Sequence, residues 1–260
     1  MIKQSDIIAD MHTHTIFSQH AFSTLRENLE VAAERGMKYI VVSDHYYKNG
    51  DEIVQKNEVN RILYVGMRAS SNRYGVRVIN SFEGNLSQKP SDTLERKIVN
   101  GKIKYRPVGL HSWFVEREKR TLDDVLRLFK RANKDNLFNV FAHIERELDK
   151  VFYGTYSIRA MPDPDIEKFF EQIVSYAKEN NILLEVNESS LTYDGVGNRE
   201  RMACWLSLAK ENGNKIVLGS DAHYCDEVGM FTNSIAMLNE IEYPKELIIS
   251  CNEDEILKFV

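Results

Sequence analysis

The stretch Asp10-Met-His-Thr-His-Thr-Ile-Phe-Ser-Gln-His20 decides the fold that this sequence predicts. It follows the short apolar run Ile7-Ile8-Ala9, which predicts a first β-strand with three imidazoles at or beyond its end. Residues i and i+2 of a strand point to the same face, so His12 and His14 can converge while His20 folds back from the loop. This arrangement predicts a metal site, and the alternative is one histidine packed in a core beside a solvated one.

Seven strand-like runs alternate with helical runs along the chain. The strand-like runs after the first cover residues 38–45, 76–85, 107–112, 139–144, 182–187 and 215–223, and the helical runs cover 24–36, 52–74, 121–133, 165–179 and 198–212. This alternation predicts βαβ units and therefore an α/β fold with a parallel sheet or barrel. Residues 86–106 interrupt it and are interpreted as an insertion with a hairpin turn at Asn100-Gly101. The tail from Leu247 predicts a short closing strand and a helix.

The polar residues that follow these strand-like runs are the best candidates for a functional site. All seven histidines fall at or just past a strand end, and two acids occupy the same position; the set is His12, His14, His20, His45, Glu83, His111, His143, Asp221 and His223. The carboxyl ends of parallel strands meet at one face, so these side chains are expected to converge. Nine nitrogen and oxygen ligands exceed what one ion with an open position needs. The sequence therefore predicts two or three divalent transition metals, with zinc favoured and manganese or iron as alternatives. The competing interpretation buries each histidine singly with its own hydrogen-bond partner.

The composition is that of a globular protein and excludes several classes. With 260 residues, 43% of them hydrophobic and 28% charged, one core is expected, and we predict a single domain over residues 1–260. The net charge of −5 gives no basic surface, so no nucleic-acid partner is expected. No apolar run approaches the ~20 residues of a membrane span, and the three cysteines lack a C-x-x-C spacing. These features predict a cytoplasmic protein without membrane contact.

Six motifs, in order, resemble those of the polymerase-and-histidinol-phosphatase (PHP) superfamily of metal-dependent phosphoesterases. They are Asp10-x-His-x-His, Ser43-Asp-His45, Glu83-Gly, Gly109-Leu-His111, Ala142-His143 and Gly219-Ser-Asp-Ala-His223. The resemblance implies a distorted (β/α)7 TIM-like barrel with its metal site at the C-terminal face of the strands. The amidohydrolase barrels also begin with His-x-His, but nothing in this sequence supplies their bridging lysine.

His20 makes the sequence similar to the bacterial three-zinc phosphatases of the superfamily, which implies a trinuclear metal centre. Three groups of ligands are implied: His12, His14, Glu83 and Asp221 on one metal; Glu83, His111 and His143 on a second; and His20, His45 and His223 on the third. The implied activity is hydrolysis of a small phosphate monoester by a metal-bound hydroxide. The expected partner is a small phosphorylated metabolite.

Beyond the metal ligands Glu83 and Asp221, Asp44 and Arg146 are candidate catalytic residues. Phosphoryl transfer depends on positioning and charge stabilisation, so one cation near the cluster is expected. The candidates are Arg146, Lys150, Arg159 and Arg199. Asp10 and Asp44 are expected either to accept the distal N–H of imidazole rings or to form strand-end and cap hydrogen bonds. Glu185 and Asn187 also end a strand, and the sequence leaves their roles open.

Three functions remain open at this stage. The first is a phosphatase of a small metabolite, with histidinol-phosphatase activity on L-histidinol phosphate as the named alternative. The second is a protein-tyrosine phosphatase, in which the aromatic loop 152–156 lines or closes a cleft. The third is a non-enzymatic, metal-stabilised binding module, against which the complete ligand set argues. Neither the substrate nor the oligomeric state follows from the sequence.

Overall fold

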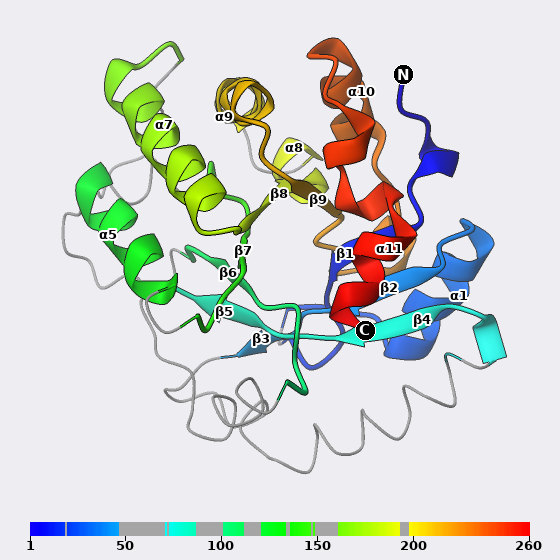
Figure 1. Ribbon diagram of the computed structural model, residues 1–260. Coiled ribbons are helices and arrows are strands. Elements are labelled where there is room, and N and C mark those ends of the chain that lie inside the picture. Colours follow the sequence, from blue (N-terminus) through cyan, green and yellow to red (C-terminus); the bar gives the residue numbers. More distant parts are fainter. Residues whose placement is uncertain are drawn as a thin grey trace.

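Strands and helices alternate along the chain, and the helices lie outside the strands (Figure 1). The computed structural model describes residues 1–18, 20–46, 71, 73–86, 101–111, 121–133, 136–146, 148, 161–192 and 198–260. The strands are β1 (Ala9–Thr13), β2 (Tyr39–Val42), β3 (His45–Tyr46), β4 (Arg77–Asn80), β5 (Glu83–Asn85), β6 (Pro107–Gly109), β7 (Val140–Phe141), β8 (Leu183–Asn187) and β9 (Ile216–Gly219). The helices are α1 (Leu25–Glu34), α5 (Leu122–Asn133), α7 (Pro164–Glu179), α8 (Glu188–Thr192), α9 (Asn198–Asn212), α10 (Thr232–Glu240) and α11 (Glu253–Ile256).

In the described part of the chain every strand pair is parallel, as the alternation predicts, and the strands form two sheets. The first has the order β1-β2-β4, and the second has the order β3-β5-β6-β7-β8-β9. Two runs predicted as single strands are therefore divided, because β2 and β4 pair in the first sheet while their continuations β3 and β5 pair in the second. In the first of these runs the break falls at Ser43 and Asp44. The Asp44 carboxylate accepts hydrogen bonds from Thr15 there.

The first and last strands lie side by side. An isolated parallel bridge joins Thr13 to Ala222, just after β9. The backbone N–H of Asp221 donates to the carbonyl of His12 at 2.9 Å, and that of His14 donates to Ala222 at 2.9 Å. The seven predicted runs thus follow one another in barrel order. In the described residues the junction between first and last strands is a bridge, not an extended ladder.

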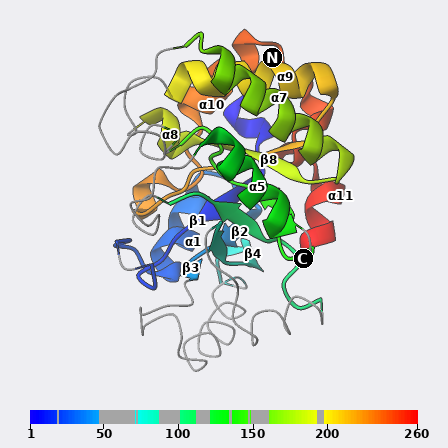
Figure 2. The same ribbon diagram turned by 90° about the vertical axis from the view of Figure 1, so that its left-hand side faces the viewer.

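Alternate residues along the strands belong to two apolar clusters. Ala9, Met11 and Val217 belong to a cluster among the strands, whereas neighbours such as Ile40 and Leu218 pack with the helices. This alternation is the period of two expected of a strand whose two faces are both buried. Figure 2 shows α5 and α7 lying together on the outer side of the strands.

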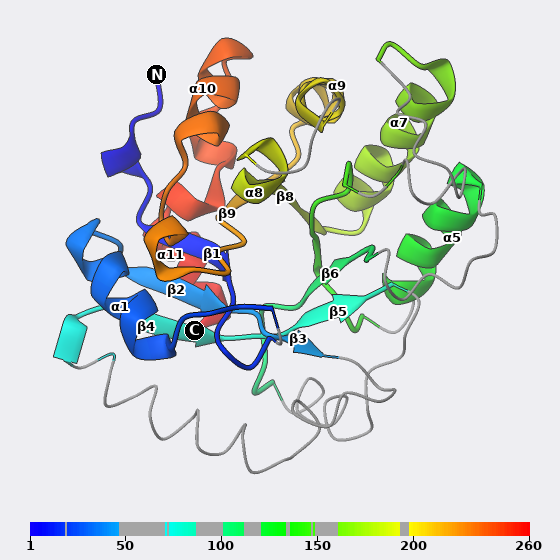
Figure 3. The same cartoon turned by 180° about the vertical axis from the view of Figure 1, so that it is seen from behind.

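The C-terminal segment covers the strands at the end opposite to the loops that follow β1 and β9 (Figures 1 and 3). The closing strand predicted from Leu247 is wrong apart from a single bridge between Ile216 and Ile248. Two short 3₁₀ turns, Lys245–Leu247 and Ile249–Cys251, occupy this stretch instead. Ile249 belongs to the inner apolar cluster, which is the cluster among the strands that contains Ala9, Met11 and Val217. The predicted helix after this stretch is present as α11.

Local sequence signals explain where the helices begin. Thr24 and Glu27 form the predicted capping box of α1, in which the N–H of Thr24 donates to Glu27 at 2.6 Å. The N-cap of α7 is Asp163, whose side chain accepts from the N–H groups of Asp165 and Ile166. These caps fix the helices that follow the first and fifth runs.

Several predictions fall outside the described residues. They concern most of the helix at 52–74, the insertion between residues 87 and 100, and the aromatic loop 152–156. The single-domain assignment also stays a prediction. Within the described part of the chain, no helix combines the length and apolar character needed to cross a bilayer.

Candidate metal centre

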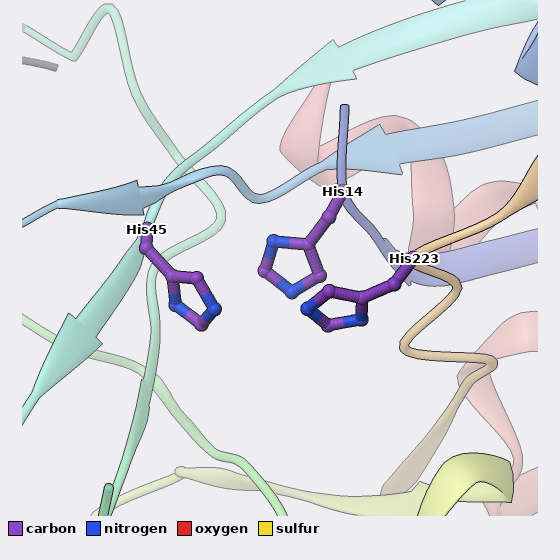
Figure 4. Close-up of side chains that lie close together, drawn as sticks. All are labelled: His14, His45 and His223. Carbon is purple, nitrogen blue, oxygen red and sulfur yellow. The ribbon is translucent and has the colours of Figure 1, made fainter. Parts of the chain in front are cut away.

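The nine candidate ligands come together from six of the predicted runs and the loops after them. Seven of the nine side chains are buried, and only His20 and His223 are partly exposed. Figure 4 shows His14, His45 and His223 directed toward one another from the chain after β1, from β3 and from the chain after β9. The predicted convergence at the strand ends is present.

Glu83, the first residue of β5, lies among five imidazoles, of which His14 is the most distant, with its Nε2 3.6 Å from Oε2. Its Oε1 is 2.7 Å from Nε2 of His143 and 3.1 Å from Nε2 of His111. Its Oε2 is 2.9 Å from Nδ1 of His45 and 3.5 Å from Nε2 of His12. The carboxylate is fully buried, and its two oxygens face different histidines. Each oxygen can therefore bind a different cation.

His12 and His14 share a face, as their spacing predicts. Their Nε2 atoms are 3.0 Å apart, and Nε2 of His14 is 3.1 Å from Oδ1 of Asp221. The same carboxylate oxygen is 3.6 Å from Nε2 of His12. This pair and Asp221 therefore form a second focus of donor atoms beside Glu83.

The remaining histidines form a third focus at the more exposed side. The ring of His223 has its centroid 4.4 Å from those of both His14 and His20. The Nε2 atoms of His20 and His45 are 3.2 Å apart. Among the residues that the structure describes, three sets of donor atoms are close enough to hold a metal ion: His14, His45 and His223; His12, His14 and Glu83; and His45, Glu83 and His111. His14 and His45 are thus shared between foci, which the sequence did not indicate.

The donor atoms suit cations, because lone pairs face one another. Nδ1 of His12 is 2.6 Å from Oε1 of Glu185, so this nitrogen donates and Nε2 presents its lone pair to the cluster. Nδ1 of His223 donates to the carbonyl of Asp221 at 2.8 Å, and Nε2 of His223 has no hydrogen-bond partner among the described residues. Imidazole nitrogens together with carboxylate oxygens are a donor set for zinc and similar divalent ions.

The electrostatics of the cluster favour neutral imidazoles beside ionised acids. Burial, reinforced by His223 and His45, holds the pKa of His14 well below its usual value. Burial also lowers the pKa values of His20 and His45 to about 4. Burial would raise the pKa of Glu83, but His111, His12 and His45 outweigh it and hold that pKa well below the usual range. Neutral imidazole and ionised carboxylate are the forms that bind metal.

His143 and His12 are the exceptions. Burial would lower the pKa of His143, but its hydrogen bond with Glu83 raises it. His12 identifies where positive charge is most stabilised. Burial would lower its pKa, but the carboxylates of Glu185, Glu83 and Asp221 raise it well above the usual value. In the absence of a metal, a proton on His12 balances the negative charge of these carboxylates. A divalent cation would balance this charge more fully and displace that proton.

The backbone is strained where two of the candidate ligands leave their strands. His143 has φ of +32° and Asp221 has φ of +55°, in a region that residues other than glycine rarely adopt. Such strain is kept where the side chain must point in one direction. Nearby, a Cβ on Gly109 would lie 2.7 Å from Nε2 of His143, and a Cβ on Gly219 would lie 2.6 Å from Cβ of His12. Two motif glycines thus make room for the imidazoles.

Of the four candidate cations, Arg146 lies at the cluster. Its Nη1 donates to Oδ2 of Asp221 at 2.8 Å, and about a quarter of its side chain is exposed. Arg199 is exposed and pairs with Glu240 at 2.8 Å. Lys150 and Arg159 lie outside the described residues.

Of the two roles left open for Asp10 and Asp44, the structure shows hydrogen bonds to the backbone and to hydroxyl groups. Asp10 accepts hydrogen bonds from the backbone N–H groups of His12, Ser220 and Gly229. These are hydrogen bonds at the strand ends and not to an imidazole ring. Asp44 bonds Thr15 and Ser18.

Glu185, whose role the sequence left open, accepts a hydrogen bond from Nδ1 of His12. Its partner in β8, Asn187, donates to Oδ2 of Asp221 at 3.3 Å. The signal for both was their i, i+2 spacing at a strand end, which places them on the face occupied by the ligands.

A buried histidine–carboxylate cluster where parallel strands end is the architecture of metal-dependent hydrolases with an α/β barrel-like fold. The chain belongs to the PHP family, since the PHP domain model matches residues 10–189. It is 27% identical to a protein from Clostridium acetobutylicum described as a probable phosphatase, over 97% of this chain and 94% of that one. A probable phosphatase from Photobacterium profundum is 26% identical, over 97% and 93% of the two chains.

The fold is also that of a solved histidinol phosphate phosphatase from Lactococcus lactis, crystallised with zinc, L-histidinol and phosphate. The TM-score is 0.64 at 16% sequence identity, and the match covers 91% of this chain and 94% of that chain. The similarity in fold confirms the α/β class predicted from the sequence.

Proposed function

We propose that this PHP-family protein is a metal-dependent phosphatase that hydrolyses a small phosphate monoester at two or three divalent ions, with zinc favoured. One observation carries the proposal: imidazole nitrogens and two buried carboxylates meet at distances of 2.7–3.6 Å, an arrangement that a cation would stabilise. The family match supports the reaction class.

The proposed ligands form three groups. His12, His14, Glu83 and Asp221 hold one ion, Glu83 with His111 and His143 holds the second, and His20, His45 and His223 hold the third. The donor sets in the described residues agree with this division for His12, His14 and Glu83, whereas His14 also lies with His45 and His223, and His45 lies with Glu83 and His111. Bound ions would supply Lewis acidity, which activates water and neutralises phosphoryl oxygens.

The chain's own residues then bind and orient the substrate. The ion pair with Asp221 places the partly exposed guanidinium of Arg146 beside the cluster, where its positive charge can stabilise the phosphoryl group. Asn187 restrains the same carboxylate oxygen of Asp221 from the buried side. Asp44 makes its hydrogen bonds to Thr15 and Ser18, so we assign it a positioning role instead of direct contact with substrate.

L-Histidinol phosphate is the first substrate to test, because the Lactococcus lactis neighbour was solved with L-histidinol and phosphate. A panel should add sugar, nucleotide and amino-acid phosphates, and a phosphotyrosine peptide for the protein-tyrosine phosphatase alternative. Turnover restricted to the peptide would replace the small-metabolite proposal. Zinc binding without turnover of any phosphate ester would favour the binding-module alternative.

Arg146→Ala, with Arg199→Ala as the matched control, tests the proposed phosphate contact. Loss of a charge-assisted contact to a phosphoryl group should lower kcat/KM on an aryl phosphate by about 100-fold. The control removes an exposed arginine that pairs with Glu240, so its kcat/KM should be unchanged. Equal activity of the two variants would overturn the role of Arg146, and no activity in zinc-loaded wild type would overturn the function.

A further inference from the structure

Ser18 is a buried serine whose hydroxyl contacts three different groups around His14. Its Oγ is 2.8 Å from Oδ1 of Asp44, 2.9 Å from Nδ1 of His14 and 3.1 Å from the backbone nitrogen of His45. Its exposed fraction is 1%, so water cannot substitute for these partners. The segment after β1 thereby joins the carboxylate of one run to the imidazole of another.

The hydrogens on these groups can be assigned by counting donors and acceptors. A carboxylate only accepts, whereas a hydroxyl has one hydrogen and two lone pairs. Asp44 also accepts from the N–H of Thr15 at 2.8 Å and from its hydroxyl at 2.7 Å, so its oxygens act as acceptors toward this segment. The hydroxyl of Ser18 therefore donates to Asp44. Its lone pairs are left to accept the backbone N–H of His45 and the ring N–H of His14.

This assignment fixes which nitrogen of His14 is available to a metal. If Nδ1 carries the hydrogen, Nε2 carries the lone pair, and Nε2 faces Oδ1 of Asp221 at 3.1 Å. The backbone of His14 is held as well, since its N–H donates to Ala222 and its carbonyl accepts from Asn28 at 2.9 Å. Ring orientation is thus fixed before a cation binds, and the contact with Ser18 favours the Nδ1–H tautomer in competition with Asp221 at Nε2.

We propose that Asp44, acting through the hydroxyl of Ser18, selects the tautomer of His14 that exposes Nε2 and ties this ring to the position of His45. Ser18 and Asp44 are then positioning residues for metal binding, and neither touches substrate. The inference rests on the proposed metal-dependent function. It assigns Ser18 a role that neither the motifs nor the implied ligand set contain.

The two members of the His-x-His pair are oriented by different devices. His12 donates directly to the carboxylate of Glu185, whereas His14 reaches its carboxylate through one intervening hydroxyl. The interposed hydroxyl also accepts from the N–H of His45, so one side chain positions candidate ligands from two runs. Removing it should therefore weaken metal binding without removing a ligand.

The test compares Ser18→Ala with Ser43→Ala in protein labelled with ¹⁵N-histidine. Ser43 is also fully buried in the Ser-Asp-His motif, but its hydroxyl has no hydrogen-bond partner among the described residues, so it is a matched control. In zinc-loaded wild type, His14 should show a slowly exchanging Nδ1 proton, assigned by its absence in His14→Asn. Ser18→Ala should lose this protection and bind zinc about 10–100-fold more weakly, and Ser43→Ala should change neither.

Two outcomes would overturn the proposal that Asp44 acts on His14 through Ser18. One is an Nε2-protonated His14 in the metal-free protein, and the other is an unchanged Nδ1 proton and zinc affinity in Ser18→Ala. If Ser18→Ala does not fold, Ser18→Cys keeps a side chain of similar size with a weak acceptor. Ser18→Cys should then show the same loss of protection of the Nδ1 proton. Unchanged protection in Ser18→Cys would overturn the proposed role of Ser18. Wild type that takes up no zinc would refute the proposed function separately, and the ring-proton comparison in that metal-free protein would still decide the proposed role of Ser18.

Discussion

Glu185 offers the sharpest test of how the cluster is supported, because it touches two candidate ligands without being one. Its Oε1 accepts from Nδ1 of His12 at 2.6 Å, and its Oε2 accepts from the backbone N–H of His143 at 3.1 Å. Asn187 donates to the same Oε2 at 3.4 Å. Glu185→Ala would leave these buried donors without an acceptor.

The magnitude follows from those contacts. Each buried donor left unpaired costs about 1–3 kcal/mol, so losing the two shorter contacts should lower the free energy of unfolding by about 2–6 kcal/mol. Because the ring of His12 also loses the group that fixes its tautomer, zinc affinity should fall about 10–100-fold. Glu185→Gln should lose less, since an amide oxygen can still accept from His12 while its NH₂ faces the N–H of His143 unfavourably.

Glu188→Gln is the matched control. Glu188 is another buried acid just beyond β8, but it accepts from the N–H groups of Asn233 and Ser234, both at 2.8 Å, at the start of α10. It should lose stability and keep zinc affinity. Urea unfolding of metal-free protein measures the first quantity, and competition with a chromophoric chelator measures the second. Equal zinc affinities in the Glu185 and Glu188 variants would refute the orienting role of Glu185.

Three further predictions concern the same cluster. Gly219→Ala should lower both thermal stability and metal content, since the new Cβ would lie 2.6 Å from Cβ of His12; an unchanged Tm would contradict this packing. Zinc uptake at pH 7 should release protons and tighten as pH rises through the raised pKa of His12, because metal-free His12 holds a proton there. Titration calorimetry in two buffers of different ionisation enthalpy measures this release, and equal heats would exclude it. His20→Ala should remove about one metal equivalent by mass spectrometry if His20 belongs to a third site, whereas unchanged stoichiometry would favour two.

Local patterns in the sequence predicted the features of the fold and site that depend on short-range geometry. The i, i+2 spacing placed His12 and His14 on one face, and strand ends located Glu83 and Asp221 beside them. The capping box at Thr24 likewise depends on residues three positions apart. In each case the determining distance lies within one element or follows from parallel strands ending at a common edge.

What the sequence did not predict depends on contacts between distant segments. Glu185 lies 173 positions from His12, and nothing local distinguishes it from Asp10 as the acceptor for that ring. The closing strand from Leu247 failed because 3₁₀ turns place Ile249 in the inner apolar cluster there. Tertiary packing determines these contacts, and the periodicity of apolar residues in the sequence carries no information about tertiary packing.

We propose that the convergent imidazoles and carboxylates hold catalytic metal ions. Mass spectrometry of native protein purified without chelator, with phosphatase activity measured on the same sample, tests it directly. We expect two to three equivalents of divalent transition metal, and activity that is lost on chelation and restored by zinc. A fully folded protein that carries no metal and takes up no zinc would contradict the account.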